Sequence, residues 1–243
     1  MMDRSPEPLA LGDKEVHVWH ASLDLSVSQI QRLGHTLSAE ERKRAERYRF
    51  PKDRERFIAA RGLLRTILGR YLKTEPGRLR FCYNSCGKPE LAGETGNGSL
   101  RFNVSHAHER ALYAVTYGRA VGVDIEYIRP DLVGEKMAER FFSPREVAVL
   151  RALPEHMQTR AFFNCWTRKE AYIKARGQGL SIALDRFDVS LTPGAPAALL
   201  SVDGDPQEAS RWSLRELSVG SDYVAALAAE GQDPQLTCWR WER

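Results

Sequence analysis

An internal repeat constrains the fold of this chain more than any other feature of its sequence. In each copy an alternating strand precedes a capping box that opens a helix, and a longer helix follows. We therefore predict an α+β fold of two similar halves, residues 1–118 and 119–243, with strands meeting at a seam and a site between the halves. Chance similarity is the alternative, because few positions are identical and capping boxes are common. At a shift of 105 residues the matches are Val16 with Val121, Val18 with Val123, Ser38 with Ser143, Glu41 with Glu146 and Phe57 with Phe162.

Hydrophobic periodicity and turn residues predict the individual elements. Helices are expected to begin at the Ser38 and Ser143 capping boxes, and two longer helices are expected over residues 56–72 and about 158–175. Gly118-Arg119 is expected to form the tip of a hairpin. The expected strands are Glu15–His20, Leu79–Tyr83, Leu100–Val104, Ala111–Tyr117, Val121–Ile128, Phe187–Leu191, Ala198–Val202, Trp212–Leu217, Tyr223–Ala228 and Leu236–Trp241.

The composition is typical of a soluble protein, with 42% hydrophobic and 28% charged residues and no apolar run long enough to cross a bilayer. Residues 1–15 contain acids and prolines where a secretory signal would have a basic start and an apolar stretch, so we expect a cytoplasmic protein. The 4 cysteines are too scattered for a disulfide scaffold, and no further Cys/His pair accompanies Cys82 and Cys86 to bind zinc. We expect free thiols.

Positive charge is concentrated between residues 42 and 70, although the net charge of the whole chain is only +4. Such a cluster favours an anionic partner, and nucleic acid, a phosphorylated cofactor or an acidic protein would each fit. Acidic residues are interspersed, so a solvated helix surface is an equally good explanation. The basic residues are Arg42, Lys43, Arg44, Arg47, Arg49, Lys52, Arg54, Arg56, Arg61, Arg65 and Arg70.

The strand Val121-Gly-Val-Asp-Ile-Glu126 is the most informative short segment. Its two-residue period places Asp124 and Glu126 on one face while Val123 and Ile125 point into the core. Two carboxylates held this close favour a cation between them, and a site of oxygen ligands without Cys or His suits Mg²⁺ better than zinc. An exposed strand face that carries two acids is the alternative.

Three other segments contain residues that could bind a ligand or take part in catalysis. The helix from Trp166 to Lys174 places Glu170 and Lys174 on one face, where they could equally form a stabilising surface pair. A turn, Gly87-Lys-Pro-Glu-Leu91, presents Lys88, and the strand Phe102-Asn-Val-Ser-His106 ends on a hydroxyl and an imidazole. Each segment alone has an ordinary structural explanation.

Together, GKPEL, FNVSH, VGVDIE and WTRKEAYIK, in this order, resemble the Sfp-type phosphopantetheinyl transferases. The signature of that family is a G-[VI]-D-x-E strand followed after about forty residues by W-[ST]-x-K-E-[AS]-x-x-K. Here 41 residues separate Asp124 from Trp166, and the likeness extends from about residue 15 to residue 230. The resemblance implies two α+β halves related by a pseudo-twofold axis, with the active site in the cleft between them, in agreement with the repeat.

The resemblance also implies an activity. Members of the family transfer 4′-phosphopantetheine from coenzyme A to a serine of an acyl or peptidyl carrier protein, and adenosine 3′,5′-bisphosphate leaves. Asp124, Glu126 and Glu170 would hold Mg²⁺, with Mn²⁺ as an alternative ion, on the pyrophosphate of coenzyme A. Glu170, or a water held at the site, would take the proton from the serine, and Lys174 would act near the pyrophosphate as a point charge or proton donor. Asp124, Glu170 and Lys174 are the expected catalytic residues.

The same resemblance implies further contacts to coenzyme A phosphates. Arg56 would face the 3′-phosphate, since the planar donor group of arginine suits a dianion. The alignment is loose around Arg44, and Glu41 occupies a neighbouring place where some family members are basic. The expected coenzyme A contacts are Arg44, Arg56, Lys88, Ser105, His106 and Lys174.

Carrier domains of peptide, polyketide or fatty-acid synthases are the expected partners, and neither nucleic acid nor a membrane is expected. Fusion of two halves in one chain suggests a monomer, in contrast to the shorter trimeric members of the family. The main rival is a non-catalytic module that holds coenzyme A or nucleic acid. A degenerate relative that only holds coenzyme A should have lost a carboxylate or Lys174, and none is missing. A nucleic-acid binder would have no need of buried paired acids in a positively charged protein. A transferase that uses another phosphorylated donor is a closer alternative.

Overall fold

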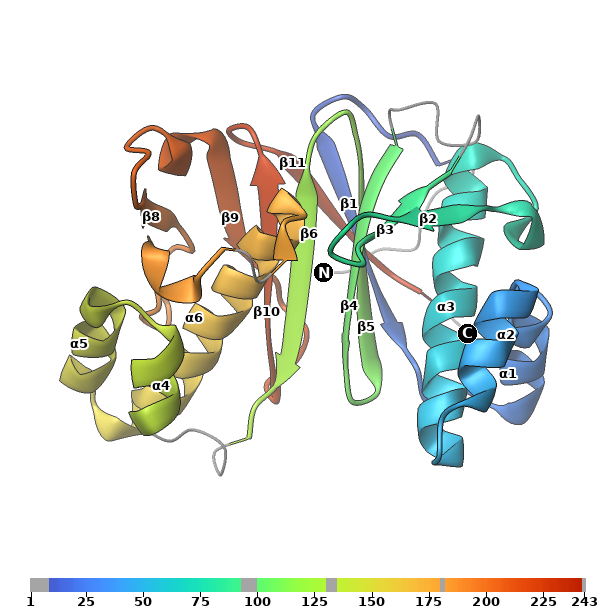
Figure 1. Ribbon diagram of the computed structural model, residues 1–243, viewed down its shortest axis with the longest axis horizontal. Coiled ribbons are helices and arrows are strands. Elements are labelled where there is room, and N and C mark those ends of the chain that lie inside the picture. The colour runs from blue at the N-terminus through green and yellow to red at the C-terminus, as the bar shows by residue number, and fades with distance from the viewer. Residues whose placement is uncertain (1–8, 93–99, 130–134, 180–181, 242–243) are drawn as a thin grey trace.

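The computed structural model describes residues 9–92, 100–129, 135–179 and 182–241. Two β-sheets lie next to each other in the middle of the molecule, and a long helix covers the outer side of each (Figure 1), which confirms the predicted α+β class. None of the described helices is both long and apolar enough to cross a membrane. The helices are α1 (Val27–Gly34), α2 (Ala39–Glu46), α3 (Pro51–Leu72), α4 (Glu135–Phe141), α5 (Pro144–Ala152) and α6 (Glu155–Arg176).

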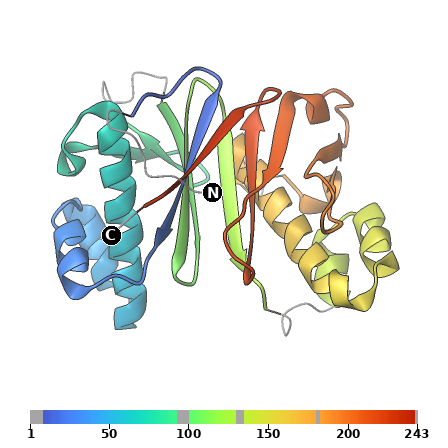
Figure 2. The same cartoon turned by 180° about the vertical axis from the view of Figure 1, so that it is seen from behind.

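The first sheet has four strands in the order β11 (Gln235–Arg240), β1 (Glu15–Ser22), β5 (Arg110–Tyr117) and β4 (Leu100–Ala107). Strand β1 pairs antiparallel with β5 and parallel with β11, as the view from behind shows (Figure 2). The last strand of the chain therefore lies in the same sheet as the first. A short hairpin of β2 (Phe81–Tyr83) and β3 (Pro89–Leu91) precedes β4.

The second sheet has three strands in the order β6 (Val121–Tyr127), β10 (Tyr223–Glu230) and β9 (Trp212–Glu216). The hairpin predicted around Gly118-Arg119 is wrong, because β5 and β6 belong to different sheets. Both edges of β5 are already paired, to β1 and to β4, so β6 pairs with β10 instead. The two remaining strands, β7 (Phe187–Val189) and β8 (Leu199–Val202), pair with each other.

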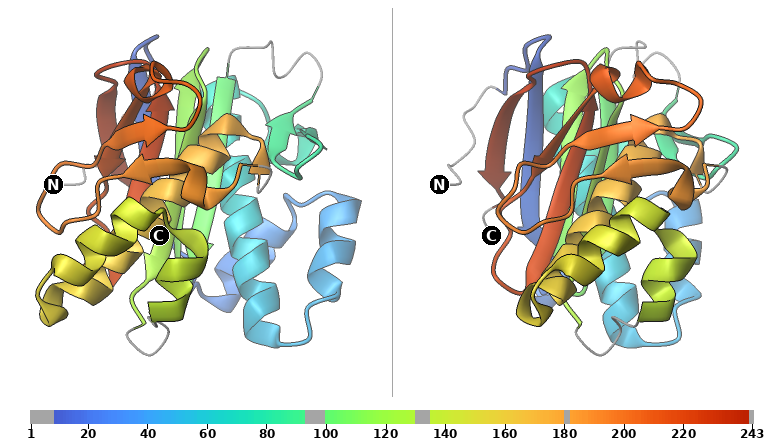
Figure 3. Two further views of the ribbon diagram at one scale, coloured as in Figure 1. Left: turned by 60° about the vertical axis from the view of Figure 1, so that its left-hand side comes forward. Right: turned by 90° about the vertical axis from the view of Figure 1, so that its left-hand side faces the viewer.

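Three apolar clusters hold these layers together. One cluster lies between α3 and the first sheet, and a second lies between α6 and the second sheet. In the side view, α4, α5 and α6 lie on the outer side of the second sheet (Figure 3). The third fills the space between the two sheets and includes Val16, Val18, Val123 and Ile125. The strand period therefore acts as predicted, with Val123 and Ile125 in the core.

Both predicted capping boxes are present. The Ser38 hydroxyl accepts from the backbone of Glu41 and the Glu41 carboxylate accepts from the backbone of Ser38; Ser143 and Glu146 repeat this arrangement with proline at the first helical position. The four cysteines are free thiols, as expected. The pseudo-twofold relation between the halves stays a prediction.

Candidate active site

The candidate site forms where α6 crosses β6. The crossing needs a residue without a side chain on the strand, because a Cβ atom at Gly122 would lie 2.1 Å from the Ala171 carbonyl oxygen. This close approach brings the last turns of α6 over the strand that carries Asp124 and Glu126. The glycine of the VGVDIE segment therefore has a structural role in assembling the site.

Asp124 and Lys174 meet at this crossing. The Lys174 ammonium lies 2.6 Å from Asp124 Oδ1 and donates at 2.9 Å to the Ser105 hydroxyl. Ser105 in turn donates to Asp124 Oδ1 at 2.8 Å, and both Ser105 and Asp124 are buried. Three residues from β4, β6 and α6 therefore form one closed network, which places Asp124 beside Lys174.

Glu126 and Glu170 add negative charge beside this network. Burial, followed by the Asp124 carboxylate, raises the pKa of Glu126 to about 7, and Lys174 only partly offsets this. Burial and the same Asp124 carboxylate raise the pKa of Glu170. Each of the two glutamates is thus easier to protonate than usual, and a nearby cation would stabilise its ionised form.

A divalent cation suits the chemistry of these donors, although the side chains do not form a ready cage. Within the described residues, no group of three or more His, Cys, Asp or Glu side chains is arranged to hold a metal ion. One carboxylate oxygen, Asp124 Oδ2, is nevertheless buried without a hydrogen-bond partner among the described residues. An oxygen-only donor set with an unsatisfied oxygen and two glutamates of raised pKa fits a hard cation such as Mg²⁺.

A cavity of about 220 Å³ opens at this place. Glu170 and Lys174 from α6 line it together with Lys88 from the β2–β3 turn and Asn103 from β4. The Lys88 ammonium donates to the carbonyl oxygens of Lys174 at 2.7 Å and Val121 at 3.2 Å, and burial lowers its pKa to about 8. Lys88 therefore lines the cavity and, through its hydrogen bond to Lys174, links the β2–β3 hairpin to the end of α6.

The other predicted coenzyme A contacts are more scattered. His106 follows Ser105 on β4 and is exposed. Arg56, on α3, is half-buried, and its Nε has no hydrogen-bond partner among the described residues. Arg44, on α2, is exposed, with its guanidinium 5.4 Å from the centre of the Phe57 ring. Arg44 also lines a second and larger cavity.

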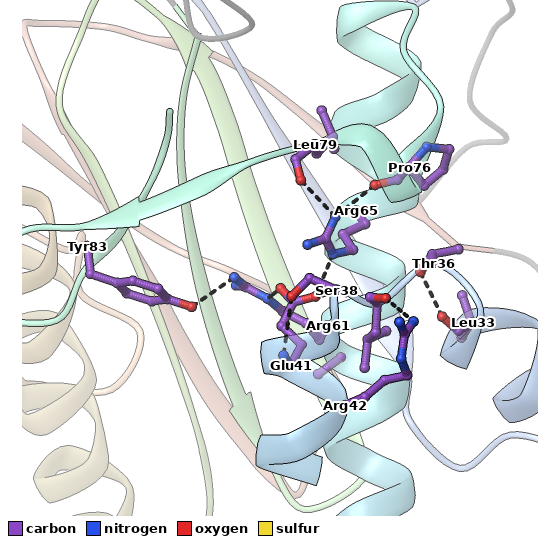
Figure 4. A network of polar contacts seen from close by, with 12 residues as sticks. Leu33, Thr36, Ser38, Glu41, Arg42, Arg61, Arg65, Pro76, Leu79 and Tyr83 are labelled. Atoms are coloured by element: carbon purple, nitrogen blue, oxygen red, sulfur yellow. Dashed lines mark hydrogen bonds and ion pairs between the residues drawn. The ribbon is translucent and has the colours of Figure 1, made fainter. Parts of the chain in front are cut away.

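This second cavity, of about 860 Å³, has a wall rich in arginine that the sequence did not reveal as a unit. Arg61 and Arg65, one turn apart on α3, both donate to the Glu41 carboxylate, and Arg61 also donates to the Tyr83 hydroxyl at 3.0 Å (Figure 4). The Arg61 guanidinium lies 4.2 Å from the centre of the Phe81 ring. The i, i+4 spacing of the two arginines was visible in the sequence, but their shared partner Glu41 was not.

Asn103 is the other residue that the sequence reasoning missed. It lies in the FNVSH segment, is buried, and accepts a hydrogen bond at its Oδ1 from the backbone amide of Val123 at 2.9 Å. No sequence signal distinguishes such a side chain from an ordinary strand residue, because its partner lies 20 residues away.

Comparison with known proteins identifies the family of the chain. The family model described as "4'-phosphopantetheinyl transferase, N-terminal" matches residues 19–117, and the "4'-phosphopantetheinyl transferase superfamily" model matches residues 120–228. The 4′-phosphopantetheinyl transferase HetI of Nostoc sp. is 45% identical over 236 residues, which are 97% of this chain and 96% of that protein. The 4′-phosphopantetheinyl transferase Sfp of Bacillus subtilis is 31% identical and covers 86% of this chain and 89% of its own.

Among solved structures, the ACPS-CoA complex of Chronobacterium ammoniagenes matches 48% of this chain and 99% of its own at 24% identity and a TM-score of 0.35, too remote a likeness to place any residue. The 45% identity to HetI, by contrast, extends over nearly the full length of both chains and is high enough to assign the family. The chain belongs to the 4′-phosphopantetheinyl transferase family, and it is a transferase.

Proposed function

We propose that the chain transfers 4′-phosphopantetheine from coenzyme A to a serine of an acyl or peptidyl carrier protein, with Mg²⁺ as the metal ion and Mn²⁺ as an alternative. The observation that carries this proposal is the junction of Asp124, Lys174 and Glu170 beside a cavity, in a chain of this family. In the reaction the serine oxygen forms a bond to the phosphorus on the pantetheine side of the pyrophosphate. The bond from that phosphorus to the bridging oxygen breaks, and adenosine 3′,5′-bisphosphate leaves.

Glu170 is the residue best suited to accept the proton of the serine, directly or through one water. It lines the cavity, and its raised pKa makes it a stronger base than an ordinary carboxylate. Lys174 is suited to stabilise charge on the bridging oxygen as the bond breaks, because its ammonium is already fixed by Asp124 and Ser105. Asp124 thus positions Lys174.

Asp124, Glu126 and Glu170 are the residues that would hold the metal ion. The unsatisfied Asp124 Oδ2 and the two glutamates of raised pKa support this assignment. When bound, a divalent ion neutralises negative charge on the pyrophosphate and stabilises the leaving group.

Coenzyme A would be held by basic residues, of which Arg44 lines the larger cavity and Lys88 the smaller one. Arg56, whose Nε has no hydrogen-bond partner among the described residues, would face the 3′-phosphate. Arg44 belongs to the arginine-lined cavity, whose charge suits a phosphate. His106 would contact a phosphate directly. Lys88 would do so after its ammonium releases one of the two carbonyl oxygens to which it donates. Ser105 is engaged by Asp124 and Lys174, which favours an indirect role for it.

The proposal extends to the organisation of the protein. We infer two halves, residues 1–118 and 119–243, related by a pseudo-twofold axis, in a cytoplasmic monomer. The two capping boxes at matching positions support the relation between the halves. Size-exclusion chromatography with light scattering tests the monomer, and a dimer mass would contradict it.

Mass spectrometry of apo carrier proteins tests the activity. Carrier domains from a peptide, a polyketide and a fatty-acid synthase are incubated with the chain, coenzyme A and Mg²⁺. We expect at least one to gain the mass of one phosphopantetheine, and we expect the gain to disappear when its acceptor serine is replaced by alanine or when a chelator removes the metal. Asp124→Ala should abolish labelling while the protein stays folded.

Failure of the wild-type chain to label any of the three carriers would contradict the proposed reaction. Wild-type rates in folded Asp124→Ala would remove that carboxylate from the mechanism. Retention on DNA in low salt without labelling would favour the nucleic-acid alternative.

A further inference from the structure

Strands β4 and β6 lie together at the seam between the two sheets without sharing a backbone ladder. Each is hydrogen-bonded within its own sheet, β4 to β5 and β6 to β10. The edge of β6 that faces β4 still carries backbone groups that need partners in a buried place. In the described part of the chain, side chains supply these partners.

Three side chains occupy this edge in sequence along β6. Lys88 donates to the Val121 carbonyl at 3.2 Å, Asn103 Oδ1 accepts from the Val123 amide at 2.9 Å, and Ser105 Oγ accepts from the Ile125 amide at 3.4 Å. Asn103 and Ser105 are two apart on β4, so they point to the same side. Alternate residues of one strand thus bind alternate amides of the other through their side chains.

This side-chain ladder has two consequences for the geometry of the site. A side chain between two strands separates them by more than the 4.7–4.9 Å of an ordinary ladder, and the 220 Å³ cavity opens beside Asn103. Asp124 sits between the two held amides of Val123 and Ile125. The position of its carboxylate is therefore set by the length of the side chains that reach across from β4.

We propose that Asn103 is a positioning residue for phosphopantetheine transfer, which holds β6 at the spacing that aligns Asp124 with Lys174. The inference rests on the proposed function. Asn103 acts through the Val123 amide, whereas Ser105 touches Asp124 and Lys174 directly. Among the rungs of the ladder, Asn103 is thus the one whose hydrogen bond to β6 can be removed without touching a charged group of the site.

Replacement of the accepting oxygen tests the proposal. Asn103→Leu keeps the approximate shape of the side chain but leaves the Val123 amide without its partner. Asn103→Asp keeps an accepting oxygen at the same place in either protonation state. We expect Asn103→Leu to lower kcat roughly 10- to 100-fold, because misplacement of a reacting group by about 1 Å costs on that order, with KM for coenzyme A changed less than about twofold. Asn103→Asp should recover most of the loss.

A matched control separates positioning from loss of stability. Thr116 is fully buried in β5, and its hydroxyl donates to the Glu15 carbonyl at 2.8 Å, away from the site. Thr116→Val also removes one buried hydrogen bond between a side chain and the backbone, so kcat per folded molecule should change less than about twofold. If Thr116→Val lowers kcat as much as Asn103→Leu does, or if Asn103→Leu raises KM alone, the positioning role is wrong.

Hydrogen exchange gives a readout that does not depend on activity. In Asn103→Leu the amides of Val123 and Ile125 should exchange faster than in the wild type, while those of α3 should not change relative to Thr116→Val. Unchanged exchange on β6 would overturn the ladder. If the wild type labels no carrier but β6 exchanges faster in Asn103→Leu, the ladder is correct and the proposed reaction is wrong.

Discussion

The two capping-box acids, Glu41 on α2 and Glu146 on α5, occupy matching places in the two predicted copies of the repeat, residues 1–118 and 119–243. Each caps its own short helix, and each also pairs with a cation from the long helix that follows. Glu41 pairs with Arg61 and Arg65 of α3, and Glu146 pairs with Lys169 of α6 at 2.7 Å. In both copies a local capping signal thus serves a tertiary contact between two helices.

The surroundings of the two clusters differ. The Glu41 cluster forms part of the wall of the 860 Å³ cavity, whereas the Lys169 ammonium is sealed in the interior and also donates to the carbonyls of Leu184 and Phe187. At a shift of 105 residues, Arg65 corresponds to Glu170. One copy therefore uses this helix position to hold the fold, and the other presents a carboxylate to the candidate site.

The largest expected difference between the copies is in activity. Glu170→Gln should lower kcat by about 10² to 10⁴, because an amide cannot accept the serine proton. It should not lower the free energy of unfolding, since burial already disfavours the charged carboxylate. Kinetics of carrier labelling and urea unfolding of the same sample measure both. Arg65→Met provides the contrast, with reduced stability and near-normal kcat; an unaffected kcat in Glu170→Gln would remove the functional difference between the copies.

The sealed cluster should contribute more to stability than the open one. Lys169→Met leaves the Glu146 carboxylate buried without its cation, and breaking a buried pair in this way costs about 3–5 kcal/mol. Urea unfolding should show this loss of stability. The kinetics of carrier labelling should give a near-normal kcat at temperatures where the variant is folded. In Arg65→Met the Glu41 carboxylate keeps Arg61, so a smaller loss is expected. A loss in Lys169→Met no greater than that in Arg65→Met would contradict the distinction.

Features of the sequence with a local cause were predictable. Both capping boxes depend on residues three apart, and the burial of Val123 and Ile125 depends on the strand period, so neither needed tertiary information. The likeness to a known family supplied the expectation that Asp124 and Lys174 serve one site, which local patterns alone could not justify.

Features that depend on which strands pair could not be predicted. Gly118 looked like a hairpin tip because the sequence around it gives no sign that both edges of β5 are occupied. Asn103 and Lys169 looked ordinary because their partners come from distant segments. Lys169 even lies beside Glu170 in the same motif, yet the turn of the helix directs one side chain to the core and the other to the cavity.

The smallest expected effect concerns the pH dependence of two acids, Glu41 in its arginine cluster and Glu126 at the candidate site. Burial alone would raise the pKa of Glu41, but hydrogen bonds from Arg65, the Ser38 amide and Arg61 outweigh burial and hold the pKa below its usual range. Its stabilising contribution is therefore fully present above 4.5, the ordinary pKa, and is lost as the pH falls through the lowered value. Glu126, with its pKa raised to about 7, behaves in the opposite way: stability is greatest below 4.5 and decreases as the pH rises through about 7.

Urea unfolding of Glu41→Gln and Glu126→Gln between pH 3 and pH 8 tests this opposition. Above about pH 5, Glu41→Gln should be less stable than the wild type by about 1.5–3 kcal/mol, the usual contribution of hydrogen bonds to a charged group, and the difference should shrink in acid. Without divalent metal, Glu126→Gln should match the wild type in acid and exceed it at pH 8, because the amide avoids the charge that the fold disfavours. If the two differences changed in the same direction with pH, the carboxylates could not have pKa values shifted in opposite directions. The contrast between Glu41, whose charged form its arginine partners favour, and Glu126, whose charged form burial disfavours, would then be lost.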